Sequence, residues 1–285
     1  MKRLGRFLKT ANGCFKALTK RPSKLMRPYL PDVEKKVALE RVLPKISTLV
    51  FGSSHAHFGW YAEGDEFNCA NSSCDLYHAC ELYKRILAMG APCVRRVVLF
   101  YSVFSPGFLL EKTSAGSFAI SYRHLWGIPY QARLQPVARI IEWKVKNLLL
   151  AAQASADDGY LGNNEYLVKK NSKPIDVGKR VAGHLRHCRR PVSQNGFVAE
   201  MACLAASCGH EFVVVIPPVR QDYAAILPVD HMSLCSGLTA MAEKHRFRVL
   251  DYTRNVAFGA ADFMDCDHLS KAGARKLSGL VRSSL

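Results

Sequence analysis

The sequence lacks any long apolar run, and this excludes two classes of protein. No window approaches the roughly 20 apolar residues of a membrane-spanning helix. Residues 1–24 alternate basic and apolar side chains, without the unbroken apolar stretch that a secretory signal needs. We therefore expect a cytoplasmic protein, with peripheral attachment at the inner membrane surface as the alternative.

Paired cysteines are also absent. The ten cysteines include no CxxC pair and have no histidine partners at the spacing of zinc sites. Because free cysteine is among the most buried residue types, we expect reduced and mostly buried thiols. We therefore predict that the protein holds no metal.

Acidic residues are scarce relative to basic ones. Forty lysines and arginines stand against 23 aspartates and glutamates, which gives a formal net charge of +17. Such an excess attracts anionic partners, and the candidates are acyl-CoA, acidic polysaccharide, an anionic membrane surface and nucleic acid. No helix-turn-helix, zinc finger or aromatic-basic motif accompanies the charge, so nucleic acid is the least favoured partner.

Length and composition favour one globular domain behind a basic arm. The chain has 285 residues, 49% of them hydrophobic, which is enough for a large core. Residues 1–44 are basic and carry prolines that break any long helix. This arm is either solvated or an amphipathic contact with an anionic membrane surface. The predicted domain covers 45–285, with an exposed insertion or lid at about 155–192.

Alternating strand and helix patterns predict the fold class. Buried strands are indicated by β-branched and aromatic runs at 46–51, 97–101, 212–216 and 247–252. Helices are indicated by apolar residues at helical spacing over 73–89, 134–152, 197–208, 232–245 and 270–285. In the second of these, the predicted buried face includes Val137, Ile140, Val145 and Leu149. Strands separated by helices imply parallel crossovers, so we predict an α/β three-layer sandwich with a mostly parallel sheet.

Polar groups near the predicted strand ends indicate a nucleophilic site, because active groups of open parallel sheets gather there. Ser54 follows the first strand in a sharp turn, and Asp265 and His268 are three residues apart, so their side chains can meet. A serine becomes nucleophilic when a histidine takes its proton and a carboxylate orients that histidine. We predict Ser54 as nucleophile, His268 as base and Asp265 as acid, with Asp267 as the weaker alternative acid. Simple capping roles for Ser54 and His268 are the competing interpretation.

Two short blocks of the sequence resemble the SGNH (GDSL-like) hydrolase superfamily. Phe-Gly-Ser-Ser at 51–54 is similar to the family's first block, although Ser53 stands where the family usually has aspartate. Phe-Met-Asp-Cys-Asp-His-Leu at 263–269 resembles the last block, the DxxH motif before the C-terminal helix. The resemblance implies a divergent member with a flavodoxin-like sheet, and the same roles for the serine, histidine and aspartate.

The resemblance also implies an oxyanion site. The family draws donors from the nucleophile's backbone N–H, a second-block glycine and a third-block asparagine. Here Ala70 replaces the glycine but still offers an N–H, and 102–107 contains no asparagine. Asn71, Ser102 and Ser105 are the candidates to supply the missing donor, whose loss would cost roughly a hundredfold to a thousandfold in rate.

Other histidines receive simpler interpretations. His55 and His57 flank the predicted nucleophile without carboxylates at ligand spacing, so we expect substrate contact or packing rather than a metal. His184 and His187 lie in a basic run with Arg180, and we expect a solvated face there. A site for phosphate or carboxylate is the alternative for this run, because guanidinium groups suit both.

The predicted function is ester chemistry on carbohydrate. By the resemblance, the chain is a serine esterase or O-acyltransferase that acts on acyl esters, above all O-acetyl esters, of a carbohydrate or surface polysaccharide. No cofactor is expected, except acetyl-CoA as acyl donor if the protein is a transferase. The alternative is a catalytically inactive SGNH-like protein that binds carbohydrate or a partner, and the missing asparagine favours it.

Overall fold

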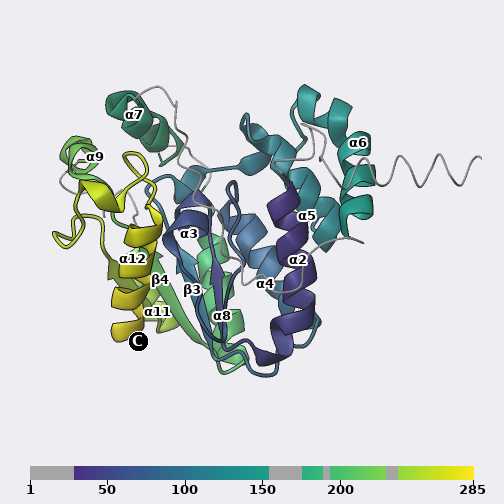
Figure 1. Ribbon diagram of the computed structural model, residues 1–285, viewed down its shortest axis with the longest axis horizontal. Helices are drawn as coiled ribbons and strands as arrows, with labels where there is room; N and C mark the ends of the chain where they lie inside the picture. The colour runs from purple at the N-terminus through teal and green to yellow at the C-terminus, as the bar shows by residue number, and fades with distance from the viewer. Residues whose placement is uncertain (1–28, 154–174, 189–192, 229–236) are drawn as a thin grey trace, which may run out of the picture.

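The computed structural model describes residues 29–153, 175–188, 193–228 and 237–285. Within them, five strands form one sheet in the order β2-β1-β3-β4-β5, and every neighbouring pair is parallel (Figure 1). The strands are β1 (Thr48–Phe51), β2 (Glu66–Asn68), β3 (Arg96–Phe100), β4 (Glu211–Ile216) and β5 (Arg248–Asp251). The predicted fold class, a three-layer α/β/α sandwich, is confirmed.

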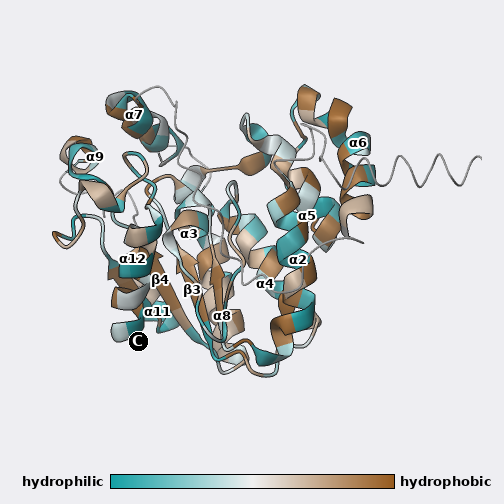
Figure 2. Cartoon of the chain, viewed as in Figure 1, coloured by the Kyte–Doolittle hydropathy of each residue, from teal (hydrophilic) through white to brown (hydrophobic). Residues whose placement is uncertain are grey.

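The strands are almost uniformly apolar because both faces of the sheet are buried. Along β3, Val97 and Leu99 belong to one hydrophobic cluster, and Val98 and Phe100 belong to a second. Successive strand residues point to opposite faces, so the two clusters are the two sides of one sheet. Hydrophobic residues accordingly run along the strands between the helices (Figure 2).

Helices cover both faces. The cluster on one face includes residues from α2 (Leu30–Val42), α4 (Leu76–Ala88), α8 (Asn195–Ser207) and α11 (Leu238–His245). The other face is covered by α3 (Ser54–Gly59) and α12 (Lys271–Ser283). The further α-helices described are α5 (Ala119–Trp126), α6 (Pro136–Gln153), α7 (Val177–Cys188) and α9 (Gln221–Ile226). Short 3₁₀ helices span Leu43–Lys45, Ser105–Gly107, Leu110–Lys112, Gly116–Phe118 and Ala260–Asp262.

The segment before β1 differs from the predicted basic arm. Residues 1–28 lie outside the described residues, but Leu30–Val42 forms helix α2. Pro31 lies in the first turn of this helix, where no intrahelical N–H bond is lost, so it does not break the helix. Val33 and Leu39 are each 1% exposed and pack into the core. Residues ahead of 45 therefore belong to the packed core.

Only part of the predicted insertion lies within the described residues. Residues 154–174 and 189–192 are outside the described residues, and between them lies α7.

Helix α6 is present, but its buried side differs from the prediction. Val145 and Leu149 are fully buried, whereas Val137 and Ile140 are 72% and 71% exposed. The reason is that α6 packs on α5 and α2 rather than on the sheet.

None of the described helices combines the length and apolar character needed to cross a bilayer.

Candidate active site

Ser54 is the first residue of α3, just beyond β1. The chain passes from strand to helix through Gly52, whose φ of +143° is a conformation that side chains rarely adopt. A Cβ atom on Gly52 would lie 2.9 Å from the Cβ atoms of both Ala56 and Phe100. The glycine therefore allows a tight turn against β3, and this turn places Ser54 at the carboxyl edge of the sheet.

Asp265 and His268 lie on the loop that leads into α12. An antiparallel bridge between Phe263 and Leu269 holds the ends of this loop together. Inside it, Asp265 Oδ1 accepts the backbone N–H groups of Asp267 at 3.0 Å and of His268 at 2.7 Å. Such side-chain to backbone bonds are how aspartate stabilises turns. The loop thus fixes the acid and the imidazole relative to each other.

Three predicted side chains meet at this edge of the sheet. Ser54 Oγ lies 2.9 Å from His268 Nε2, and His268 Nδ1 lies 2.8 Å from Asp265 Oδ2. Burial raises the pKa of Asp265, but the hydrogen bond from His268 and its charge outweigh burial and hold that pKa below the ordinary value. The ionised carboxylate keeps a ring proton on Nδ1, so Nε2 is free to accept the Ser54 proton.

A second carboxylate lies behind the first. Asp267 is 1% exposed, and its Oδ2 lies 3.1 Å from His55 Nε2 and 3.0 Å from Arg180 Nε. Its other oxygen is 3.6 Å from His268 Nδ1, too long for a hydrogen bond. Burial raises the pKa of Asp267, yet the bond from His55 and the neighbouring cationic groups hold it far below the ordinary value. Asp265, as predicted, is the direct partner of His268.

Helix α7 brings two basic side chains into the site. Arg180 pairs with Asp267, and His184 Nδ1 lies 2.7 Å from the hydroxyl of Tyr223. Burial lowers the pKa of His184 to about 3, so this imidazole is neutral at pH 7. The predicted solvated face is wrong for these two residues: Arg180 supplies a cation to the buried carboxylate, and the His184 ring packs against Phe104. His187 packs its ring against Phe108.

The predicted oxyanion donors at 70 and 71 are engaged elsewhere. The N–H of Ala70 donates to Asn68 Oδ1 at 3.1 Å, so the expectation that it is free is wrong. The side chain of Asn71 donates to the hydroxyl of Tyr122 at 3.2 Å and lines a cavity beneath α2 rather than the site. Asn68 lies two residues before Ala70, and an asparagine side chain readily accepts the backbone N–H two residues on.

Ser102 and Ser105 follow β3 and lie at the same edge as Ser54. Ser102 Oγ is 2.6 Å from His55 Nδ1, and the Ser102 N–H donates to Ser105 Oγ at 2.9 Å. Their contacts are thus with each other and with His55. The backbone N–H groups of Ser54 and His55, in the first turn of α3, have no hydrogen-bond acceptor within the described part of the chain. N–H groups in the first turn of a helix have no intrahelical acceptor, so these two are candidate donors to an oxyanion.

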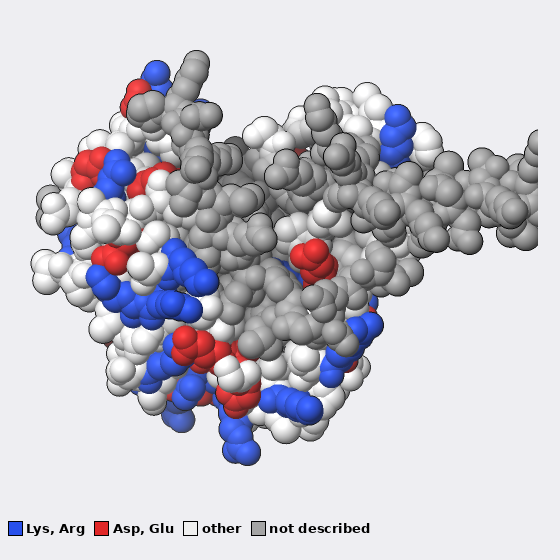
Figure 3. All heavy atoms as spheres, in the orientation of Figure 1, with Lys and Arg blue, Asp and Glu red and all other residues white. Residues whose placement is uncertain are grey.

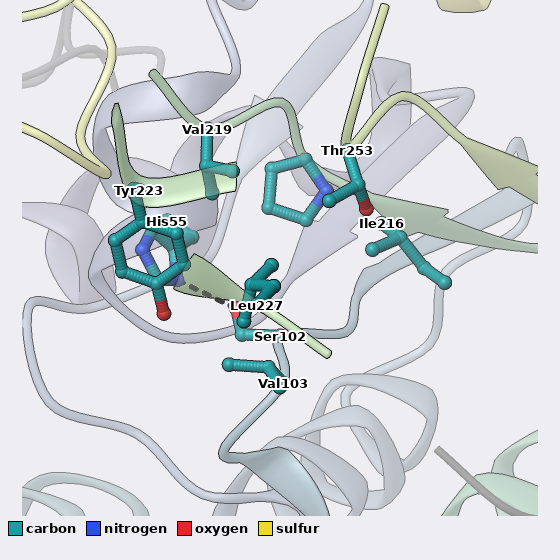
Figure 4. A pocket seen from close by; sticks show the side chains of 9 residues that line it. His55, Ser102, Val103, Ile216, Val219, Tyr223, Leu227 and Thr253 are labelled. Carbon is teal, nitrogen blue, oxygen red and sulfur yellow. Dashed lines mark hydrogen bonds between the residues drawn. The ribbon is translucent and has the colours of Figure 1, made fainter. Parts of the chain in front are cut away.

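A pocket adjoins this cluster. Figure 4 shows His55 and Ser102 joined by their hydrogen bond, with side chains of the β4 and β5 ends around them. Most of the lining is apolar. The other residues that line the pocket are Val103, Ile216, Pro217, Val219, Tyr223, Leu227 and Thr253.

His57 packs rather than binds. It is 4% exposed, and its Nδ1 lies 3.0 Å from Lys35 Nζ and 3.1 Å from the carbonyl oxygen of Ala70. Burial lowers its pKa well below the ordinary value, and the neighbouring Lys35 charge acts in the same direction. His57 is therefore a neutral core residue, in agreement with the packing alternative.

One buried cluster away from the site has donor atoms within 4.8 Å of one another, as a metal site would. His78 Nδ1 lies 2.7 Å from Asp75 Oδ1, and His78 Nε2 lies 3.7 Å from Glu111 Oε1. Within the described residues, His78 Nε2 and Glu111 Oε2 have no hydrogen-bond partner. Two carboxylates thus share one imidazole. The expectation that the protein holds no metal stays a prediction.

Basic side chains gather over α12, with acidic side chains beside them (Figure 3). Arg282 pairs with Glu63 at 3.1 Å and with Glu66 at 2.7 Å, and Lys276 pairs with Asp262. Arg275 lies over the ring of Tyr61. Much of the charge on this helix is therefore used within the fold.

No protein-family model matches the chain, and a comparison with curated proteins found no match either.

Proposed function

We propose that this chain is a divergent SGNH-type serine esterase or O-acyltransferase, with Ser54 as nucleophile, His268 as general base and Asp265 as the orienting acid. The observation that carries the proposal is the 2.9 Å separation of Ser54 Oγ and His268 Nε2, with Asp265 at 2.8 Å from the other ring nitrogen. A serine hydroxyl needs such a base, and the base needs such a carboxylate.

In the proposed reaction, Ser54 Oγ attacks the carbonyl carbon of an acyl ester and its proton passes to His268. Asp265 stabilises the imidazolium, which then protonates the departing alcohol. The N–H groups of Ser54 and His55 stabilise the negative oxygen of the tetrahedral intermediate. Water or a sugar hydroxyl, deprotonated by His268, then takes the acyl group from Ser54 and restores the free serine.

The proposed substrate is an O-acetyl or similar short acyl ester of a carbohydrate or surface polysaccharide. Two considerations support it: the resemblance of 51–54 and 263–269 to the SGNH blocks, and the net charge of +17, which favours anionic ligands. For a transferase, acetyl-CoA is the proposed acyl donor. The basic N-terminal arm is the proposed contact with an anionic membrane surface.

Hydrolysis of p-nitrophenyl acetate tests the proposal. The Ser54→Ala variant should lose at least about a thousandfold in kcat/KM, because the nucleophile is gone. Ser53→Ala is the matched control, since it removes a neighbouring hydroxyl and should leave most of the activity. Equal thermal unfolding of the three proteins shows that the fold is intact. Full turnover by a folded Ser54→Ala protein would rule out the proposed nucleophile.

Product analysis separates hydrolase from transferase. The protein is supplied with acetyl-CoA and a mixture of methyl glycosides, and acetate and acetyl glycoside are measured. A transferase forms acetyl glycoside, whereas a hydrolase forms acetate alone. Both products should disappear in Ser54→Ala.

A non-catalytic carbohydrate-binding protein is the second candidate. The engagement of the Ala70 N–H with Asn68, together with the lack of an asparagine at 102–107, favours it because two oxyanion donors are missing. This candidate predicts equal binding of acetylated polysaccharide by the wild type and Ser54→Ala in calorimetry. It also predicts no ester hydrolysis by either protein.

A further inference from the structure

A second serine, histidine and aspartate are in contact beside the first set. Ser102, just after β3, has its Oγ 2.6 Å from His55 Nδ1, and His55 Nε2 lies 3.1 Å from Asp267 Oδ2. All three residues are buried, at 3%, 5% and 1% exposure. Figure 4 shows the bond between Ser102 and His55 at the pocket. The proposed Ser54 reaction does not use the Ser102 hydroxyl.

The protons of this second set are arranged to activate the hydroxyl. Asp267 is ionised because His55, His268 and Arg180 hold its pKa far below the ordinary value against the effect of burial. Burial lowers the pKa of His55, so its ring is neutral. The single ring proton therefore lies on Nε2, facing Asp267, and Nδ1 accepts the proton of Ser102.

The two sets differ in the way that each imidazole is used. His268 faces its serine with Nε2 and its aspartate with Nδ1, whereas His55 faces them with Nδ1 and Nε2 respectively. Each serine has a separate base and a separate closest carboxylate. Ser102 therefore has a base and a carboxylate that are distinct from those of Ser54.

Ser102 and His55 also line a pocket of their own. Its walls are mostly apolar, with Ile216 at the end of β4, Val219 in the loop after it, Tyr223 in α9 and Leu227 just after α9. The pocket is small, with a volume of about 20 Å³, which is room for one water-sized group. A pocket of this size beside the Ser102 hydroxyl limits an acyl group to the smallest ones, such as acetyl.

We propose that Ser102 is a second reactive serine, which takes a short acyl group from an activated ester. Ser102 Oγ attacks the carbonyl carbon and forms the new ester bond, while its proton passes to His55 Nδ1. The bond to the leaving oxygen breaks, and His55 returns the proton to that alcohol or phenol. Asp267 stabilises the imidazolium between the two steps. The products are acyl-Ser102 and the free alcohol.

Acetylation by p-nitrophenyl acetate in the full-length Ser54→Ala protein tests the proposal. Trypsin separates the two serines, because 46–84 and 97–112 are uninterrupted by lysine or arginine before their last residues. Tandem mass spectrometry of the second peptide distinguishes Ser102 from Ser105. Ser121 is the internal control: it is buried and bonded to Asp32, but no imidazole contacts its hydroxyl within the described residues.

We expect Ser102 to be acetylated at least about tenfold faster than Ser121, because His55 lies within hydrogen-bond distance of Ser102 and can take its proton. His55→Gln and Asp267→Asn, each added to Ser54→Ala, should slow it at least about tenfold. Thermal unfolding checks that each variant is folded. A slower reaction in one folded variant of the two is enough to support the proposal. Unmodified Ser102 in folded Ser54→Ala, or an unchanged rate in a folded His55→Gln variant, would overturn the proposal. Loss of turnover at Ser54 leaves this result unaffected, so the two proposals fail separately.

Discussion

The imidazole rings of His55 and His268 are stacked, with centroids 5.0 Å apart and 29° between their planes. Two positive rings at this separation would repel by about 3 kcal/mol at an effective dielectric constant of 20. A proton on one ring therefore disfavours a proton on the other. Asp265 and Asp267 each bond to one of the rings, so the protein can stabilise either imidazolium, but one at a time.

The two aspartates should differ in their effects on the proposed Ser54 reaction. Asp265→Asn is expected to lower kcat for p-nitrophenyl acetate by about 10⁴-fold, because the imidazole loses its orienting acceptor. Asp267→Asn should lower it far less, since Asp267 lies 3.6 Å from His268 Nδ1 and is bonded to other groups. Steady-state kinetics of both variants provides the comparison. Equal losses would show that the assignment of the acid to Asp265 is wrong.

Asp267 should make stability depend on pH in the acid range. Its folded pKa is depressed, so its contribution is complete above the unfolded value of about 3.9 and is lost as pH falls below it. Asp267→Asn is expected to cost about 3–5 kcal/mol at pH 7, because Arg180 loses its buried partner. Urea unfolding at pH 7, 5 and 3 measures the gap between wild type and variant. A gap that does not shrink at pH 3 would contradict the assignment.

Gly52 should be far less tolerant of a side chain than Gly209. Both have positive φ, but a Cβ on Gly209 meets nothing within 4 Å, whereas one on Gly52 meets Ala56 and Phe100 at 2.9 Å. Gly209→Ala should cost about 1 kcal/mol, and Gly52→Ala at least about 3 kcal/mol. Denaturant unfolding of the pair checks this. Similar losses would mean that the turn before Ser54 relaxes easily.

His78 should be important for stability, because it is the one cation-forming partner that the described residues give to the buried Asp75 and Glu111 carboxylates. His78→Ala is expected to lower the free energy of unfolding by about 3–5 kcal/mol. His124→Ala is the matched control, since the pair of His124 with Glu142 is partly exposed and should contribute less than about 1 kcal/mol. Comparable effects would show that the buried carboxylates have another source of compensation.

The layers of the fold and the Ser54 set could be predicted because both depend on local patterns. The apolar run of β4 and the Gly-Ser-Ser turn identify strand and turn within a few residues. Asp265 and His268 are three positions apart, so their contact follows from one loop. Short segments escaped prediction: β2 has three residues, and only its pairing with β1 in the folded sheet defines it as a strand.

The contacts of Arg180 and Ser102 could not be predicted because they join residues far apart in the sequence. Arg180 reaches Asp267 across 87 positions, and Ser102 reaches His55 across 47. A basic run such as the one in α7 has the sequence character of a solvated surface. Only the buried carboxylate, which the fold places opposite, makes it part of the site.

The position of the 263–269 loop in the sequence also determines when the three side chains can meet during synthesis. Ser54 is synthesised 214 positions before the histidine that contacts it. A growing chain therefore carries Ser54 without this imidazole until His268 has been added. Because Asp265 and His268 are three residues apart, both are added at nearly the same moment, and the three side chains can come together only after that.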